Sequence, residues 1–317
     1  MKRKGNLYKD IYQFENIVSA YNEVCRNTKN KLKVAMFKEY KCIYVSRIHN
    51  ILESKTYKPG PYNVFTIYEP KERRIVSQNM LDKVINHLVS RHILYPALLP
   101  CLLDVNVASR KGLGTSEGIR LAMEFHRICK IKYGTYYVLK CDISKFFASI
   151  DHDILKSKLK KRIKDKDALK IVFDIIDMEK YGLSIRCDVD PSVSHFFLND
   201  MDHFIKEHLK IKYFVRYQDD FLLFHPSKQY LKYCLNEITN FLKMEKLTLN
   251  NKTRIYKSTN NFIFLGRKAN GNYARHRNIK RKIKKQVYLY RSCKIKLSGL
   301  VSSIICYKNL CKKKGSN

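Results

Sequence analysis

The chain has 317 residues, of which 45% are hydrophobic, so it is long and apolar enough to bury a core, and we expect a globular protein, not a disordered one. Lys and Arg number 63 against 28 Asp and Glu, and a net charge of +35 repels itself unless a polyanion binds nearby. No apolar run is long enough to span a bilayer, and no signal-peptide core follows Met1. We therefore expect a cytoplasmic protein that binds nucleic acid and no membrane. The ten cysteines are scattered without a Cys-x-x-Cys pair, which argues against a disulfide framework or a structural zinc.

The N-terminal region predicts helices followed by a hairpin. Between Tyr8 and about Leu52, apolar residues recur at a spacing of three and four, which indicates two or three amphipathic helices. A Pro/Gly break at Lys58–Pro61 ends this pattern. The β-prone segments Val64–Tyr68 and Arg73–Val76 then flank a turn and predict a hairpin with a basic tip.

The next elements are two helices and a buried strand. Helices are expected from about Met80 to Leu94 and from about Ser116 to Ile131, with the glycine-punctuated loop Arg110–Thr115 between them. Tyr136–Cys141 is apolar enough to be a buried strand, and Asp142 stands at its end.

The second half of the chain predicts helices and then a strand pair. A basic helix is expected over 150–163, and another helix starts with Asp190 as N-cap and Pro191 at the first helical position. Tyr213–Tyr217 and Phe221–Phe224 read as strands joined by a tight turn. This order of elements predicts an α+β sheet with helices packed on one face.

Three acidic residues indicate a candidate metal site. Asp219 and Asp220 adjoin in a turn between apolar strands, where the like charges call for a neutralising cation. Asp142 ends another apolar strand, so side-by-side pairing of the strands would bring the carboxylates together. Hard oxygen ligands suit Mg²⁺, with Mn²⁺ as the alternative ion. Two such ions would activate an attacking 3′-hydroxyl and stabilise a leaving pyrophosphate. An Asp-Asp dipeptide alone is more often an ordinary polar turn.

The surrounding residues carry a family resemblance. The segment Asp142–His152 resembles motif A of bacterial reverse transcriptases, and Tyr217–Asp220 resembles their Y-x-D-D turn. The resemblance covers nearly the whole chain. It implies an α+β right-hand polymerase fold and an RNA-directed DNA polymerase that makes cDNA by two-metal-ion nucleotidyl transfer. The implied domains are an N-terminal helical extension at 1–60, fingers at 61–135, a palm at 136–266 that includes helices over 150–210, and a basic helical thumb at 267–317.

The resemblance also implies roles for individual residues. Catalysis is expected from Asp142, Asp219, Asp220 and Lys252 as general acid, and metal binding from Asp142, Asp219, Asp220 and the backbone carbonyl of Ile143. Nucleotide binding is expected from Lys71, Arg74, Arg110 and Phe147, and template or primer contact from Tyr217, Gln218, Arg186, Gly266 and Arg267. The Phe147 ring would clash with a 2′-hydroxyl and favour dNTPs, although a buried Phe beside Phe146 is the structural alternative. For Lys252, a phosphate contact is the alternative.

One motif departs from the family pattern. Gly182–Ile185 is followed by Arg186, and Asp190 and Pro191 replace the family's Ser-Gln, which leaves the template contact open. The closest overall resemblance is to reverse transcriptases of diversity-generating retroelements and their short group II intron-like relatives. An antiphage-defence reverse transcriptase that acts with a noncoding RNA, with atypical or untemplated DNA synthesis, is the alternative.

The expected partners follow from charge and family together. They are an RNA template or structured noncoding RNA, an RNA–DNA hybrid and dNTPs, while an accessory protein or a homo-oligomer stays open. No Asp or Glu follows Glu245, and the run His276–Lys285 predicts phosphate contact. Two other functions remain open: an idle palm scaffold that only binds RNA, and a palm polymerase that makes RNA or untemplated DNA.

Overall fold

The computed structural model describes residues 3–68, 72–108, 112–178, 181–183, 189–260, 262–268 and 279–312. The chain forms two compact units, Met1–Leu265 and Gly266–Asn317.

The first unit begins with a helical region, which confirms the helices expected before residue 52. Its elements are η1 (Tyr8–Tyr12), α1 (Phe14–Asn27), α2 (Lys31–Glu39) and α3 (Lys41–Glu53). Ile17, Tyr21 and Val24 recur on one side of α1 and are buried, so this amphipathic face drives the packing. The Asn30 side chain caps α2 by accepting from Lys33 N–H at 3.0 Å.

The expected hairpin follows and is confirmed. Strands β1 (Asn63–Ile67) and β2 (Arg73–Ser77) pair antiparallel with Phe65 opposite Ile75. The residues at its tip, 69–71, lie outside the described part of the chain.

Helices make up the middle of the unit. They are α4 (Met80–Leu88), η2 (Val89–Leu94), α5 (Tyr95–Leu98), η3 (Leu99–Cys101), α6 (Thr115–Tyr133), α7 (Phe146–Ser149), α8 (His152–Lys160), α9 (Lys166–Ile176), α10 (Val189–Phe197), α11 (Asn199–His203) and η4 (Phe204–His208). The expected helix over 150–163 is shorter, because the Asp151 side chain accepts from Asp153 and Ile154 N–H groups and caps α8.

The expected start of the next helix is wrong by a residue or two. Helix α10 begins at Val189, so Asp190 and Pro191 lie in its first turn, with Asp190 no longer at the N-cap. The N–H groups of a first turn lack intrahelical partners, so proline is tolerated there without the loss of a helix hydrogen bond of its own.

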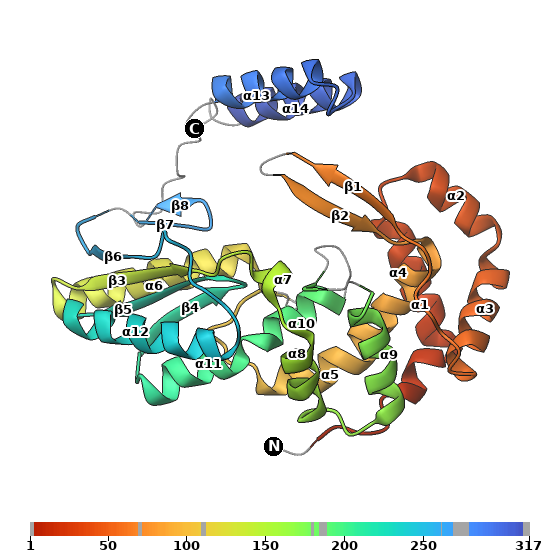
Figure 1. The fold of residues 1–317 in the computed structure, drawn as a ribbon, viewed down its shortest axis with the longest axis horizontal. Coiled ribbons are helices and arrows are strands. Elements are labelled where there is room, and N and C mark those ends of the chain that lie inside the picture. Colours follow the sequence, from red (N-terminus) through yellow and green to blue (C-terminus); the bar gives the residue numbers. More distant parts are fainter. Residues whose placement is uncertain are drawn as a thin grey trace. The chain divides into compact units, whose positions relative to one another are not determined.

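The sheet is antiparallel with strand order β4-β5-β3-β6 (Figure 1). Its strands are β3 (Tyr137–Asp142), β4 (Tyr213–Tyr217), β5 (Asp220–His225) and β6 (Arg254–Lys257). The central β3 pairs with β5 on one side and with β6 on the other. A two-residue strand, β7 (Ile263–Phe264), ends the unit.

Helices cover both faces of this sheet, so the expectation of helices on one face is wrong. On one face, Leu139 and Leu223 share a core with Leu231 and Ile238 of α12 (Lys228–Met244). On the other face, the ring of Phe125 in α6 lies 5.6 Å from Tyr213 and 6.1 Å from Phe224. The reason is visible in the strands: successive residues of β3 and β5 are both apolar, so both faces need cover.

The second unit contains β8 (Arg267–Lys268), α13 (Ile279–Arg291) and α14 (Leu297–Lys312). The two helices pack together, with Leu289, Leu300 and Tyr307 buried. Lys282 Nζ lies 5.3 Å from the centre of the Tyr307 ring, a cation–π contact. In the described part of the chain, no helix combines the length and the apolar character needed to cross a membrane.

Candidate active site

The register of the sheet places two acidic residues opposite each other. Asp142, the last residue of β3, pairs with Asp220, the first residue of β5. Directly opposed residues project their side chains from the same face, so these two carboxylates share one end of one face. The predicted side-by-side pairing of the strands is therefore confirmed.

A tight turn holds the third acidic residue beside them. Gln218 and Asp219 connect β4 to β5, and Tyr217 pairs with Asp220 across the turn. Gln218 has a φ of 56°, the left-handed conformation that such two-residue turns require. The Ile143 N–H donates to the Asp219 carbonyl at 3.2 Å, which ties the turn to the end of β3. The Ile143 side chain itself is buried.

Asp220 lies in an electrostatically unusual place. Burial raises its pKa to about 7, the neighbouring Asp142 and Asp219 raise it as well, and Lys140 lowers it. Lys140 Nζ lies 3.5 Å from one carboxylate oxygen, Oδ2. The other oxygen, Oδ1, is buried without a hydrogen-bond partner among the described residues. A buried, unsatisfied carboxylate oxygen of this kind is a natural ligand for a cation.

Asp142 is held by a loop from later in the chain. Asn250 donates its side-chain amide to Asp142 Oδ2 at 3.0 Å and its backbone N–H to the Asp142 carbonyl at 2.7 Å. The Lys252 N–H in turn donates to Asn250 Oδ1 at 3.1 Å, and the Lys252 side chain is exposed. The loop that carries Lys252 is thus linked to Asp142 through Asn250.

Lys140 and Asn250 were not among the predicted site residues. Lys140 could have been found, because it stands two positions before Asp142 in a strand and therefore projects from the same face. Asn250 had no such signal, since a contact across 108 positions of sequence depends on the fold.

A buried ion pair supports the turn from the other face of the sheet. The Arg216 side chain is 0% exposed and donates to both carboxylate oxygens of Asp202, at 2.7 and 2.5 Å. It also donates to the Gln218 carbonyl at 2.9 Å and to the His195 carbonyl at 3.2 Å. Arg216 thereby joins the turn to α10 and α11.

Phe147 follows Asp142 by five positions in the sequence and is half-buried, with its ring centre 5.5 Å from that of Phe146. The Leu183 N–H donates to the Phe147 carbonyl at 2.7 Å. Gly182 has a φ of +67°, and a Cβ there would lie 2.6 Å from the Ala148 Cα. The segment over 181–183 therefore packs against the backbone of Phe147 and Ala148, with no room for a side chain at position 182.

The roles of the remaining predicted site residues stay predictions. Lys71, Arg110 and Arg186 lie outside the described residues, as does the side chain of Arg74. Gly266, with a φ of +80°, and Arg267, in β8, belong to the second unit.

The donor set fits Mg²⁺ in a particular way. Among the described residues, no three carboxylate, imidazole or thiol groups stand close enough to hold an ion by themselves. Mg²⁺ usually takes one or two carboxylates and completes its shell with water and substrate phosphates. The Asp142 and Asp220 pair suits that mode of binding, with a triphosphate supplying further oxygens.

An antiparallel sheet with apposed carboxylates at a tight turn, flanked by helices and a hairpin, defines a right-hand polymerase fold, as the sequence predicted. Residues 57–269 match the family described as reverse transcriptase (RNA-dependent DNA polymerase). The chain therefore belongs to the reverse transcriptase family, whose members are classed as nucleotidyltransferases.

Solved structures show the same fold. Apo telomerase from Candida tropicalis, truncated from its C-terminal domain, is 14% identical with a TM-score of 0.53 over 74% of this chain and 58% of that chain. Telomerase from Candida albicans, in complex with a TWJ fragment of telomeric RNA, is 13% identical with a TM-score of 0.53 over 86% of this chain and 59% of that chain. The chain thus spans less than two thirds of either telomerase. No curated protein matches it in sequence.

Proposed function

We propose that the protein is an RNA-directed DNA polymerase whose chemistry takes place at Asp142, Asp219 and Asp220. The observation that carries the proposal is the pairing of Asp142 with Asp220 across two strands, together with an Asp220 oxygen that has no hydrogen-bond partner in the part of the chain that the structure describes. Keeping like charges at such a position destabilises a fold unless a ligand of opposite charge binds there.

In this proposal the three carboxylates and the Ile143 carbonyl hold two Mg²⁺ ions. The ions would supply activation of the primer 3′-hydroxyl and charge stabilisation of the leaving pyrophosphate. Asn250 orients the Asp142 carboxylate through its amide, and Lys140 offsets part of the negative charge on Asp220. Lys252 is proposed to protonate the pyrophosphate, and its exposed side chain is consistent with a mobile proton donor.

Other parts of the chain take the roles that the family suggests. We assign residues 61–135 to fingers, 136–266 to the palm and 267–317 to a thumb. Lys71, Arg74 and Arg110 would bind the triphosphate. Tyr217, Gln218, Arg186, Gly266 and Arg267 would contact template or primer. Phe147 would lie under the sugar and select dNTPs, and the close packing of Gly182 behind its backbone supports a fixed position.

Primer extension tests the polymerase proposal. Purified protein with an RNA template, an annealed primer, Mg²⁺ and dNTPs is expected to extend the primer, and Asp219→Ala is expected to abolish extension. Phe147→Ala is expected to admit ribonucleotides. A wild-type protein that is inert on every template, including RNA that co-purifies with it, would overturn the proposal.

For the biological setting, we propose a diversity-generating retroelement or a related domesticated element. An antiphage-defence enzyme acting with a noncoding RNA is the second candidate, and the altered residues around Arg186 favour it because they change the expected template contact. Sequencing the product distinguishes them. Copies of a defined template support the first setting, and untemplated DNA supports the second.

A further inference from the structure

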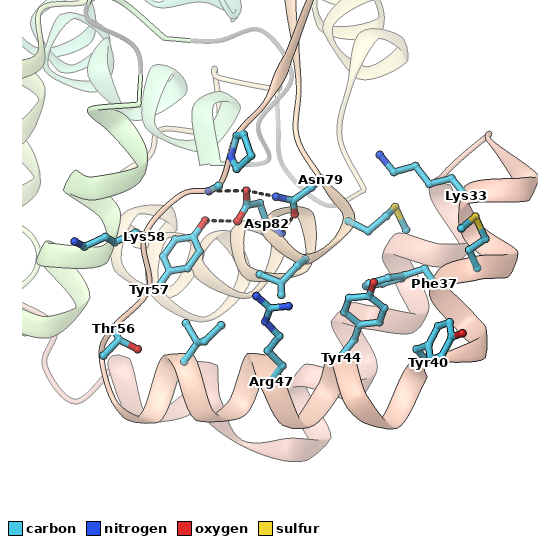
Figure 2. Close-up of a pocket in the computed structure, with 16 residues that line it drawn as sticks. Lys33, Phe37, Tyr40, Tyr44, Arg47, Thr56, Tyr57, Lys58, Asn79 and Asp82 are labelled. Carbon is cyan, nitrogen blue, oxygen red and sulfur yellow. Dashed lines mark hydrogen bonds between the residues drawn. The ribbon is translucent and has the colours of Figure 1, made fainter.

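Two polar side chains of the first unit each bind the backbone of a glycine, and they lie in different surroundings. At the wall of a cavity of about 620 Å³, the Asp82 carboxylate accepts from the Tyr57 hydroxyl at 3.0 Å, the Gly60 N–H at 3.0 Å and the Asn79 amide at 2.8 Å (Figure 2). None of the predicted site residues is among the described residues that line this cavity. A role in the fold is therefore sufficient to explain the contacts of Asp82.

The second of these side chains is His152, the first residue of α8. Its Nε2 lies 2.7 Å from the Gly182 carbonyl oxygen. A carbonyl oxygen only accepts, so Nε2 carries a proton and donates it. Its Nδ1 lies 3.3 Å from Oδ1 of Asp177, the residue that follows α9. The ring thus extends from the end of α9 to the Gly182 backbone.

The surroundings of His152 leave its ring little freedom. The Asp151 carboxylate caps α8 by accepting from two N–H groups of its first turn, and Lys246 Nζ lies 2.6 Å from the same carboxylate. Asp177 is held in turn by Lys156, whose Nζ lies 2.6 Å from Oδ1. The His152 side chain is 14% exposed. A donor whose own neighbours are fixed positions its acceptor more firmly than a mobile one does.

The same peptide group that His152 binds also binds Phe147. The Gly182 carbonyl and the Leu183 N–H belong to one planar peptide unit, and the Leu183 N–H donates to the Phe147 carbonyl at 2.7 Å. A Cβ at position 182 would lie 2.6 Å from that carbonyl oxygen, so the two backbones are already in close contact. Consecutive hydrogen bonds therefore run from His152 through one peptide group to the Phe147 backbone, and such bonds strengthen one another.

We infer that His152 is a positioning residue for Phe147, which sharpens the choice of deoxyribonucleotides over ribonucleotides by holding the Phe147 backbone in place through the Gly182–Leu183 peptide. The inference rests on the proposed function, because Phe147 is assigned there to the sugar of the nucleotide. No contact among the described residues links His152 to Asp142, Asp219 or Asp220. The effect is therefore expected on nucleotide choice and not on the chemical step.

Single-nucleotide primer extension with dNTPs and rNTPs tests the effect on nucleotide choice. His152→Asn is expected to raise the KM for dNTPs, with a smaller change in kcat. The ratio of kcat/KM for dNTPs to that for rNTPs is expected to fall about fivefold, the equivalent of one hydrogen bond. His152→Gln is expected to keep the wild-type ratio. The reason is geometric: the amide nitrogen of Gln reaches about as far as Nε2, whereas that of Asn reaches only as far as Nδ1.

Hydrogen exchange of the Leu183 amide tests the same contact without any enzymatic activity. This amide is protected by its bond to the Phe147 carbonyl. His152→Asn is expected to make it exchange about fivefold faster, because the peptide unit loses the hydrogen bond on its carbonyl side. His152→Gln is expected to leave the exchange rate at the wild-type value.

His49 provides a matched control for effects on stability. Its Nδ1 lies 2.7 Å from the Tyr12 carbonyl oxygen, its Nε2 lies 3.4 Å from the Glu53 carboxylate, and its side chain is 18% exposed. His49→Ala and His152→Ala therefore remove similar contacts, and both are expected to lower the urea concentration at which the protein unfolds. Only His152→Ala is expected to lower the selectivity for dNTPs.

The outcomes separate this inference from the proposed function. The inference is overturned if His152→Asn matches the wild type in selectivity and in exchange, if His152→Gln behaves like His152→Asn, or if His49→Ala lowers selectivity as much as His152→Ala. If Phe147→Ala admits ribonucleotides while His152→Asn leaves selectivity unchanged, the inference fails and the proposed function stands. A wild type that makes no DNA, combined with faster Leu183 exchange in His152→Asn and not in His152→Gln, would count only against the proposed function.

Discussion

Near the turn at Gln218 and Asp219, each face of the sheet carries a buried charged group, and the two groups differ in whether their hydrogen bonds are satisfied. On one face, Arg216 and Asp202 are fully buried and bonded to each other through two hydrogen bonds. On the other face, Asp220 has a buried carboxylate oxygen without a hydrogen-bond partner among the described residues. A satisfied buried charge holds structure, whereas an unsatisfied one marks the place for a ligand.

The largest effect is expected from Asp220→Asn. The change keeps the shape of the side chain and removes its charge, so DNA synthesis should fall by about a thousandfold or more, in line with the loss of a metal ligand. Stability should be unchanged or higher, since a raised pKa shows that burial disfavours the charged form. Primer extension and urea unfolding of the same preparation measure both. If Asp220→Asn lost activity only because it unfolded, Asp220 would be a stabilising residue, which would contradict its role as a ligand site.

Arg216→Met is expected to affect mainly stability, whereas Asp220→Asn is expected to affect mainly activity. Removing one partner leaves Asp202 as an uncompensated buried charge and should lower the free energy of unfolding by about 3–5 kcal/mol. Activity should fall as well, because the hydrogen bond from Arg216 to the Gln218 carbonyl is lost. Urea unfolding and primer extension at a temperature where the variant is folded report the two effects.

The double variant Arg216→Met with Asp202→Leu sharpens this test. Replacing both charges with apolar groups should recover much of the lost stability, since buried ion pairs are often no better than hydrophobic replacements. Activity should stay low, because the tether to Gln218 is still absent. Full recovery of activity would show that Arg216 only stabilises the fold and does not position the turn.

The pairing of the carboxylates could be predicted because side chains alternate between the two faces of a strand. An apolar strand that ends in Asp142 and a hairpin that turns at Asp219 leave little freedom in how they align, and the structure has Asp142 opposite Asp220. The same rule would have given Lys140. The same alternation predicts that a strand with apolar residues at successive positions is covered on both faces of the sheet. The expectation of helices on one face did not take this into account.

The supporting contacts could not be predicted, because their partners are chosen by the fold. Arg216 in the apolar strand Tyr213–Tyr217 signals a buried charge that needs a partner, but nothing in the sequence selects Asp202 among the acidic residues. The close approach of Gly182 to Ala148 is of the same kind, since it joins segments that are distant along the chain.

Gly182→Ala tests that approach and is expected to have an intermediate effect. The left-handed φ alone should cost about 1–2 kcal/mol in stability. The new Cβ would also push on the Phe147 carbonyl, which lies 2.6 Å from its position, so the KM for dNTPs should rise. Steady-state kinetics with a single dNTP measures the shift. The atoms nearest to Gly182 belong to Phe147 and Ala148 and not to the carboxylates, so a raised KM would report on Phe147. An unchanged KM would mean that Phe147 does not contribute to nucleotide binding.

The smallest effect is expected from an exposed ion pair, Asp151 with Lys246, whose charged atoms lie 2.6 Å apart. The hydrogen bond from Lys246 and the N–H of Ile154 lower the pKa of Asp151 below its ordinary 3.8, so its stabilisation is present above that value and is lost as pH falls through the folded pKa. The same bond raises the pKa of Lys246 above 10.5, so its contribution is present below that value and is lost as pH rises further.

Asp151→Asn keeps a side chain that can cap α8 while it removes the charge. The variant should therefore unfold at a slightly lower urea concentration than the wild type near neutral pH, and the difference should vanish in acid and shrink in high salt. Because this pair is exposed, its loss should matter far less than that of the buried Arg216 pair. A difference that persists in acid would mean that the cap geometry, and not the charge, stabilises the helix.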